Sequence, residues 1–197
     1  MPDTSKNRNE RHGDKRLSFP SDEKTHPWLL KLLDAYYSID ADVAAAIESW
    51  KKQNKHVACS EGCSNCCKTH KDIPVYPLEL VGISWYVTEK ISGAERETLK
   101  KQLKEHNKDN LCPFLLNDIC SVHPMRPIAC RQFNVFGKSC EEGEDAYYTR
   151  REDVMPAVFV ESSSNPEIVR LQDCHWSSLS EKMADFDKKK LDQRRKH

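Results

Sequence analysis

The stretch ACSEGCSNCCKTH, residues 58–70, places four cysteines within nine positions, at Cys59, Cys63, Cys66 and Cys67. The spacing C-x3-C-x2-C lets three sulfur atoms converge from one tight loop, and Gly62 relieves the backbone within that loop. Thiolates at this density are the ligands that zinc ions and iron–sulfur clusters need. The side chains of the adjacent Cys66 and Cys67 leave the backbone in different directions. This favours Cys67 as a bridging ligand or as a ligand of a second metal centre.

A second cysteine block follows in residues 112–140, CPFLLNDICSVHPMRPIACRQFNVFGKSC, at Cys112, Cys120, Cys130 and Cys140. These cysteines are eight to ten positions apart, so the block alone is a weaker motif than a zinc ribbon with its C-x2-C pairs. A metal centre that uses both blocks closes a long loop between them. The metal would then be part of the fold.

Two histidines are further candidate ligands. His70 follows Cys67 by three positions and His123 lies inside the second block. Nitrogen replaces sulfur in some zinc and iron–sulfur sites, but either residue is also consistent with an ordinary exposed or hydrogen-bonded histidine. Cys174 stands apart from both blocks and is expected to be a buried or free thiol.

Two arginines, Arg126 and Arg131, flank Cys130. Cations beside thiolates offset their negative charge, whereas the alternative is that both arginines pair with surface carboxylates. We favour charge compensation, because a low dielectric penalises the excess negative charge of a site with four or more thiolates.

The composition narrows the class of protein. Among 197 residues, Lys plus Arg and Asp plus Glu number 31 each, so no overall basic field indicates a nucleic-acid partner. The N-terminus has no apolar signal region, and no stretch is long and apolar enough to predict a membrane span. Nine cysteines without a signal peptide argue against a secreted disulfide scaffold. We therefore expect a cytoplasmic protein with reduced, metal-bound thiols.

The expected fold is mainly α: a small helical domain with irregular cysteine-rich metal-binding loops. We expect residues 1–25 to be a disordered tail, residues 26–185 to be the cysteine-cluster metal-binding domain and residues 186–197 to be a charged C-terminal tail.

Apolar periodicity predicts several helices within that domain. One opens at Pro27, a second begins at an N-cap at Asp40 or Asp42, a third covers about residues 77–91, and a charged helix lies within residues 92–110. The run VMPAVFV, residues 154–160, predicts a short strand, and the segment from Pro166 looks helical.

The motifs C-x3-C-x2-C-C, CPFL and C-x3-P-x-R-P-x2-C-R-x-F resemble the YkgJ-like cysteine-cluster family, described as a zinc- or iron-chelating domain, over roughly residues 59–140. The resemblance implies eight metal-linked cysteines. These are Cys59, Cys63, Cys66, Cys67, Cys112, Cys120, Cys130 and Cys140. Flagellin lysine N-methylases share a related cysteine pattern, but this chain looks too short for their other regions.

Two functions remain open from the sequence. The chain is either an iron–sulfur protein that transfers electrons or supports an oxidoreductase reaction with a redox client, or a zinc-binding module whose metal is structural or is handed to a protein partner. A radical S-adenosylmethionine enzyme is disfavoured, because such enzymes are partial α/β barrels and because Asn65 replaces the usual aromatic residue. The sequence contains no phosphate-binding loop and no hydrolase triad. Whether the protein catalyses a reaction stays open.

Overall fold

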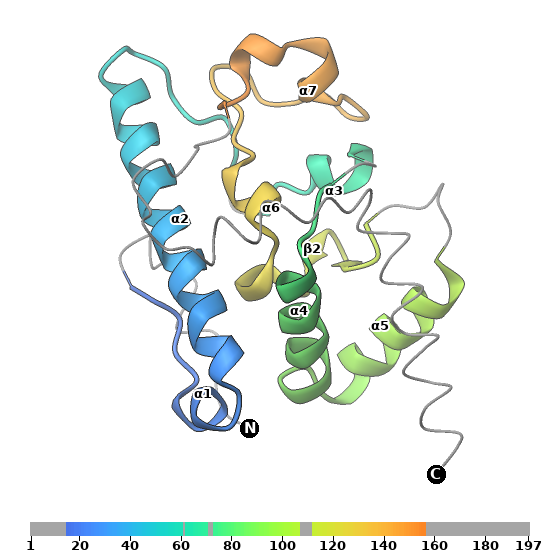
Figure 1. Ribbon diagram of the computed structural model, residues 1–197. Helices are drawn as coiled ribbons and strands as arrows, with labels where there is room; N and C mark the ends of the chain where they lie inside the picture. The colour runs from blue at the N-terminus through green and yellow to red at the C-terminus, as the bar shows by residue number, and fades with distance from the viewer. Residues whose placement is uncertain (1–14, 61, 71–72, 107–111, 157–197) are drawn as a thin grey trace.

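The computed structural model describes residues 15–60, 62–70, 73–106 and 112–156 (Figure 1). Within these ranges the chain is mainly helical, and the only sheet is a two-stranded hairpin, which confirms the expected fold class. The helices are α1 (Pro20–Thr25), α2 (Pro27–Lys51), α3 (Asn65–Thr69), α4 (Pro77–Glu89), α5 (Gly93–Glu105), α6 (Ile128–Gln132) and α7 (Ala146–Thr149). The hairpin strands are β1 (Leu115–Leu116) and β2 (Ile119–Cys120), and two 3-10 turns are η1 (His123–Met125) and η2 (Arg151–Asp153).

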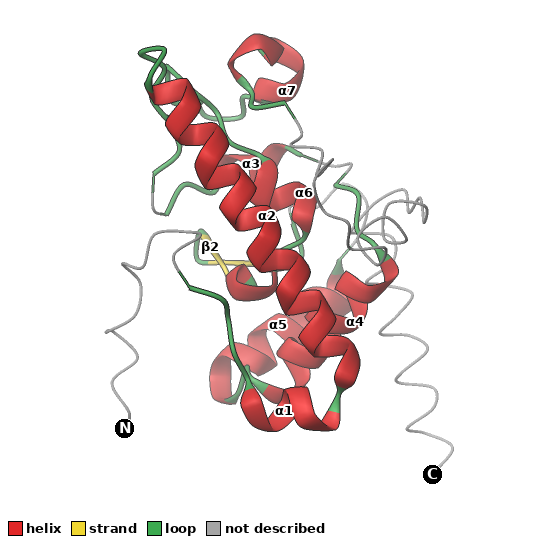
Figure 2. Ribbon diagram, turned by 60° about the vertical axis from the view of Figure 1, so that its left-hand side comes forward, coloured by secondary structure: helices red, strands yellow, loops and turns green. Residues whose placement is uncertain are grey.

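Helix α2 is one continuous element, so the prediction of a new helix at Asp40 or Asp42 is wrong. No glycine or proline interrupts this part of the chain, and alanine and isoleucine sustain the helix past both aspartates. Instead of capping a helix, the Asp40 carboxylate accepts a 2.6 Å hydrogen bond from Nη1 of Arg131 on α6. Figure 2 shows α2 as the long helix that crosses the whole domain.

The segment before α2 is folded, although the sequence analysis assigned residues 1–25 to a disordered tail. Arg16 bridges Glu23 at 3.0 Å and Asp34 at 2.5 Å, and Phe19 meets the ring of Trp85 edge-on with centroids 5.1 Å apart. These contacts hold residues 15–25, including α1, against α2 and α4. Residues 1–14 lie outside the described part of the chain.

The predicted helix over residues 77–91 is confirmed as α4, which begins at a proline, and the charged helix is confirmed as α5. The segment from Pro166, Cys174 and the predicted tail over residues 186–197 lie outside the described residues. Of the predicted strand over residues 154–160, only the start is described, and there Val154 forms an isolated bridge with Val135.

The main core, as we call it here, lies between α2, α4, α5 and the loops around η1. Its fully buried side chains include Leu32, Ile83, Leu99, Phe114 and Met125. Burial of such side chains supplies most of the folding free energy of a domain this small. Phe114 belongs to the main core and Cys112 packs against it, so this core positions the start of the second cysteine block.

A second, smaller core consists of Val135, Ala146 and Val154. Short extended segments meet there: Ala58 N donates to Val135 O at 2.7 Å, and Val135 also pairs with Val154. Helix α7 covers this small core, at the top of Figure 1. The small core joins the stretch before the first cysteine block to the end of the second.

Glu79 of α4 is a buried carboxyl group that connects two helices. Its Oε2 accepts from Tyr76 N at 2.9 Å, at the start of α4, and its Oε1 accepts from Ile128 N at 2.7 Å, at the start of α6. The side chain is fully buried, and loss of hydration raises its pKa from 4.5 to about 7, although Arg131 and the hydroxyl of Tyr36 oppose that rise. Glu79 therefore positions the helix that carries Cys130.

Gly82 of α4 marks the closest approach to α2. A Cβ atom there would lie 2.3 Å from Cδ2 of Leu32 and 3.0 Å from Cε of Met125, and both neighbours are fully buried. We expect Gly82→Ala to destabilise the protein by about 1–2 kcal/mol, because overpacking outweighs the better helix propensity of alanine. Urea unfolding measures this, with the neighbouring, exposed Val81→Ala as control. Equal stability of Gly82→Ala and wild type would contradict the close packing.

The pH dependence of stability tests Glu79. Because folding raises the pKa of this group, it favours the folded state fully below about pH 4.5, and this contribution is lost as pH rises through 7. Relative to Glu79→Gln, the wild type should lose about 2–3 kcal/mol of unfolding free energy between pH 5 and pH 8. All other titratable groups are shared by the wild type and Glu79→Gln, so their contributions cancel in the comparison. If stability fell in parallel with pH in the two proteins, the raised pKa of Glu79 would be contradicted.

Candidate metal centre

The short helix α3 carries the centre of the first cysteine block. The Asn65 amide at its first residue donates to Glu144 O at 2.6 Å, on the loop after Cys140. Three positions further along α3, Lys68 Nζ lies 2.5 Å from Oδ1 of Asp118, in the turn of the hairpin before Cys120. Side-chain contacts thus attach α3 to both ends of the second block.

Backbone contacts join the two blocks directly. Cys112 N donates to Cys67 O at 2.9 Å, so the start of the second block lies against the end of the first. Val135 N donates to the sulfur of Cys59 at 3.4 Å, which holds the other end of the first block beside the small core. An amide that donates to a cysteine sulfur is a common feature of metal–thiolate sites, where it stabilises the thiolate.

The eight cysteines of the two blocks are free thiols in the structure; Cys63 is exposed and the others are partly buried. A hydrogen bond to Cys67 and then burial raise the pKa of the Cys66 thiol, and a hydrogen bond to Cys112 is the largest cause that raises the pKa of Cys67. Burial raises the pKa of Cys130 well above its usual range. These thiols are therefore neutral until a metal ion displaces their protons.

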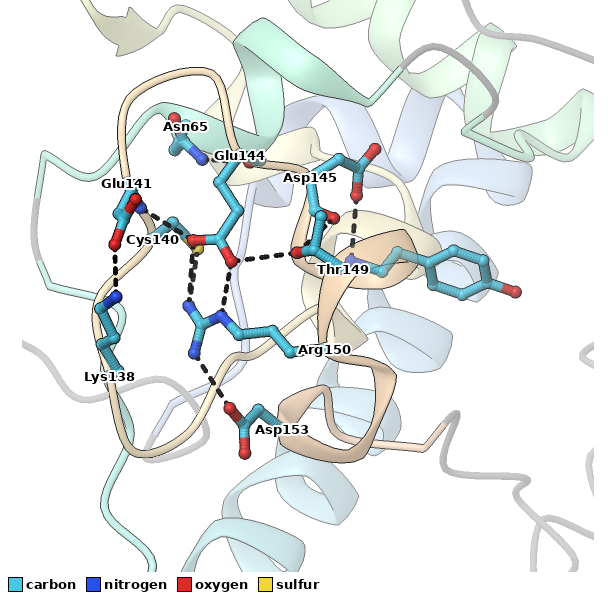
Figure 3. Close-up of polar contacts among 10 residues, drawn as sticks. Asn65, Lys138, Cys140, Glu141, Glu144, Asp145, Thr149, Arg150 and Asp153 are labelled. Carbon is cyan, nitrogen blue, oxygen red and sulfur yellow. Dashed lines mark hydrogen bonds and ion pairs between the residues drawn. The ribbon is translucent and has the colours of Figure 1, made fainter.

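Arg150 holds the sulfur of Cys140 in place (Figure 3). Its Nη2 donates to that sulfur at 3.5 Å, while its Nε donates to Glu144 Oε1 at 2.8 Å and its Nη1 to Asp153 at 3.1 Å. The hydrogen bond from Arg150 lowers the pKa of Glu144 to about 2, so this carboxylate is charged and keeps the guanidinium beside the sulfur. No sequence motif points to Arg150, because it follows Cys140 by ten positions and only the fold around α7 brings the two together.

The two arginines beside Cys130 have different roles. Burial raises the pKa of Cys120 and Cys130, and the nearby charge of Arg126 opposes that rise in both, as charge compensation predicts. The same prediction is wrong for Arg131, which is buried, pairs with Asp40 and stacks on the ring of Tyr36 at 3.9 Å. The two arginines lie on different elements, since Arg126 caps the end of η1 whereas Arg131 lies on α6.

The candidate histidines lie in distinct environments. His123 Nε2 is 3.0 Å from Nη1 of Arg126, and it must accept there because a guanidinium offers only donors. His70 Nδ1 lies 3.0 Å from Asp145 Oδ2, and its ring packs edge-on against Phe133. The prediction that one of them ligates a metal stays untested.

The donor set suits zinc or iron in its chemistry, since all eight residues are free cysteines with amide or arginine donors near several sulfurs. Within residues 15–60, 62–70, 73–106 and 112–156, however, no three His, Cys, Asp or Glu side chains are arranged so that they could hold a metal ion as they stand. Metal binding would therefore require the thiols, already gathered around α3, to move closer together.

None of the described helices combines the length and the apolar character that crossing a membrane requires.

Comparison with known proteins gives one match. Residues 58–154 match the family model CxxCxxCC, whose description is "Putative zinc- or iron-chelating domain". No curated protein and no solved structure matches the chain. The matched region includes both cysteine blocks and continues past Cys140 to Val154, so it also takes in the small core. The description of the family agrees with the predicted cofactor, an iron–sulfur cluster or zinc. Residues 58–154 therefore belong to the CxxCxxCC family, the cysteine-cluster family that the two blocks predicted.

Proposed function

We propose that this protein binds metal through the eight cysteines of its two blocks, as an iron–sulfur centre that serves electron transfer or an oxidoreductase partner. The observation that carries the proposal is the gathering of both blocks around α3, where Cys112 N donates to Cys67 O. Without a metal, a protein gains little from placing so many half-buried thiols side by side, since burial disfavours the thiolates they form.

Amide contacts to sulfur favour an iron–sulfur centre. Val135 N donates to the sulfur of Cys59, and a backbone hydrogen bond from Val122 to Cys120 opposes the rise that burial causes in the pKa of that thiol. In iron–sulfur proteins, such hydrogen bonds and the extent of solvent exposure set the reduction potential. The exposed Cys63 leaves one side of the site accessible to a redox client.

A structural zinc site is the second candidate. Contacts at α3 join chain segments that are distant in sequence, as closed all-cysteine zinc sites do in small domains. In this case the metal would stabilise an interaction module and would not change its redox state.

Radical S-adenosylmethionine chemistry finds no support in the fold. In the described part of the chain, the hairpin β1–β2 is the only sheet, whereas such enzymes alternate strands with helices.

Metal analysis of the full chain tests the proposal. After purification without oxygen, we expect a brown protein with iron and acid-labile sulfide bound in fixed proportion to the chain. Cys63→Ser should lose bound metal, and Cys174→Ser, outside both blocks, should keep it. Colourless protein with stoichiometric zinc would select the structural alternative. A metal-free wild type, or equal metal loss in the two variants, would contradict the assignment of these cysteines as ligands.

A further inference from the structure

The cysteines divide between the two cores of the protein. Cys112, Cys120 and Cys130 pack against the main core. Cys59 and Cys140 pack against the small core. Since each core is a separate packed unit, the backbone segments that carry these cysteines are held next to one another at each core. The division does not follow the sequence blocks, because Cys59 begins the first block and Cys140 ends the second.

Contacts around the small core gather one set of sulfurs. Val135 N holds the sulfur of Cys59, and Arg150 holds the sulfur of Cys140. Cys63 lies within electrostatic range of both these cysteines. Three thiols thus lie near one another beside the small core.

Contacts around the main core gather the other set. Cys67 accepts the backbone hydrogen bond of Cys112 and also forms a side-chain contact with it. Cys130 lies within electrostatic range of both Cys67 and Cys120. Four thiols therefore lie together here, and the charge of Arg126 acts on two of them, Cys120 and Cys130.

Cys66 lies at the junction, within electrostatic range of Cys59 on one side and of Cys120 and Cys130 on the other. Cys66 and Cys67 are adjacent in α3 and their thiols are hydrogen-bonded to each other, so the two sets adjoin at this helix. A sulfur-bound zinc ion or iron–sulfur cluster takes four protein thiolates. The main-core set has four without Cys66 and the small-core set has three, so Cys66 completes the small-core set.

We infer that the protein holds two adjoining four-cysteine metal centres: one formed by Cys59, Cys63, Cys66 and Cys140 at the small core, the other by Cys67, Cys112, Cys120 and Cys130 at the main core. This inference rests on the proposed metal binding and specifies its ligands. Each centre draws cysteines from both sequence blocks, so each closes the long loop between them. The peptide bond between Cys66 and Cys67 joins the two centres.

Matched variants test the division. Cys140→Ser and Cys112→Ser each remove one ligand from a different set, and both residues are partly buried. We expect each variant, purified without oxygen, to lose the metal of one centre and to keep that of the other, and the double variant to lose both. If either single variant folds and loses all metal, the division is wrong.

A second measurement uses the unaltered chain and does not depend on how the variants fold. Metal is partly removed with a chelator, freed thiols are alkylated with N-ethylmaleimide, and native and tandem mass spectrometry read the remaining metal and the modified positions. Half-loaded molecules should be alkylated at the four cysteines of one set. Modification scattered over both sets, or no half-loaded molecules, overturns the division while total metal content still supports metal binding. Wild type without any metal contradicts the proposed function itself.

Discussion

The structure depends on one constraint: its eight cysteines are clustered, all but Cys63 are partly buried, and their thiolates would repel one another. Eight thiols meet around a five-residue helix, and burial raises the pKa of Cys59, Cys120 and Cys130, so the metal-free protein keeps these thiols neutral. Neutral thiols can be packed side by side without repulsion. Thiolates can be kept there only if a metal ion and nearby cations offset their charge.

The fold meets this constraint by surrounding a short, weak helix with two stable cores. Helix α3 has too few residues to be stable alone, and the contacts of Asn65 with Glu144 and of Lys68 with Asp118 hold it in place. The other six cysteines of the two blocks lie on segments outside this helix. The cysteine side chains can therefore shift to bind metal while the two cores keep the surrounding backbone in place.

Charged residues away from the cysteines complete the framework. Glu79 joins the start of α4 to the start of α6, and Arg131 joins α6 to Asp40 in the middle of α2. Arg126 and Arg150 instead face sulfurs, one at each core. Removal of one partner from a buried pair leaves the other charge uncompensated, which costs more than the pair itself contributes.

Cysteine spacing, apolar periodicity and composition determined the family, the mainly helical class and the helices α4 and α5, because these depend on local patterns that a few neighbouring residues specify. The same patterns failed at Asp40, which looked like an N-cap but pairs with Arg131 far along the chain, and at residues 15–25, which pack against Asp34 and Trp85. Tertiary structure alone decided that Arg150 reaches Cys140 and that Arg126, but not Arg131, faces the thiols. It also decided which cysteines share a core, since sulfurs from one sequence block pack against two different cores and no linear spacing encodes that division.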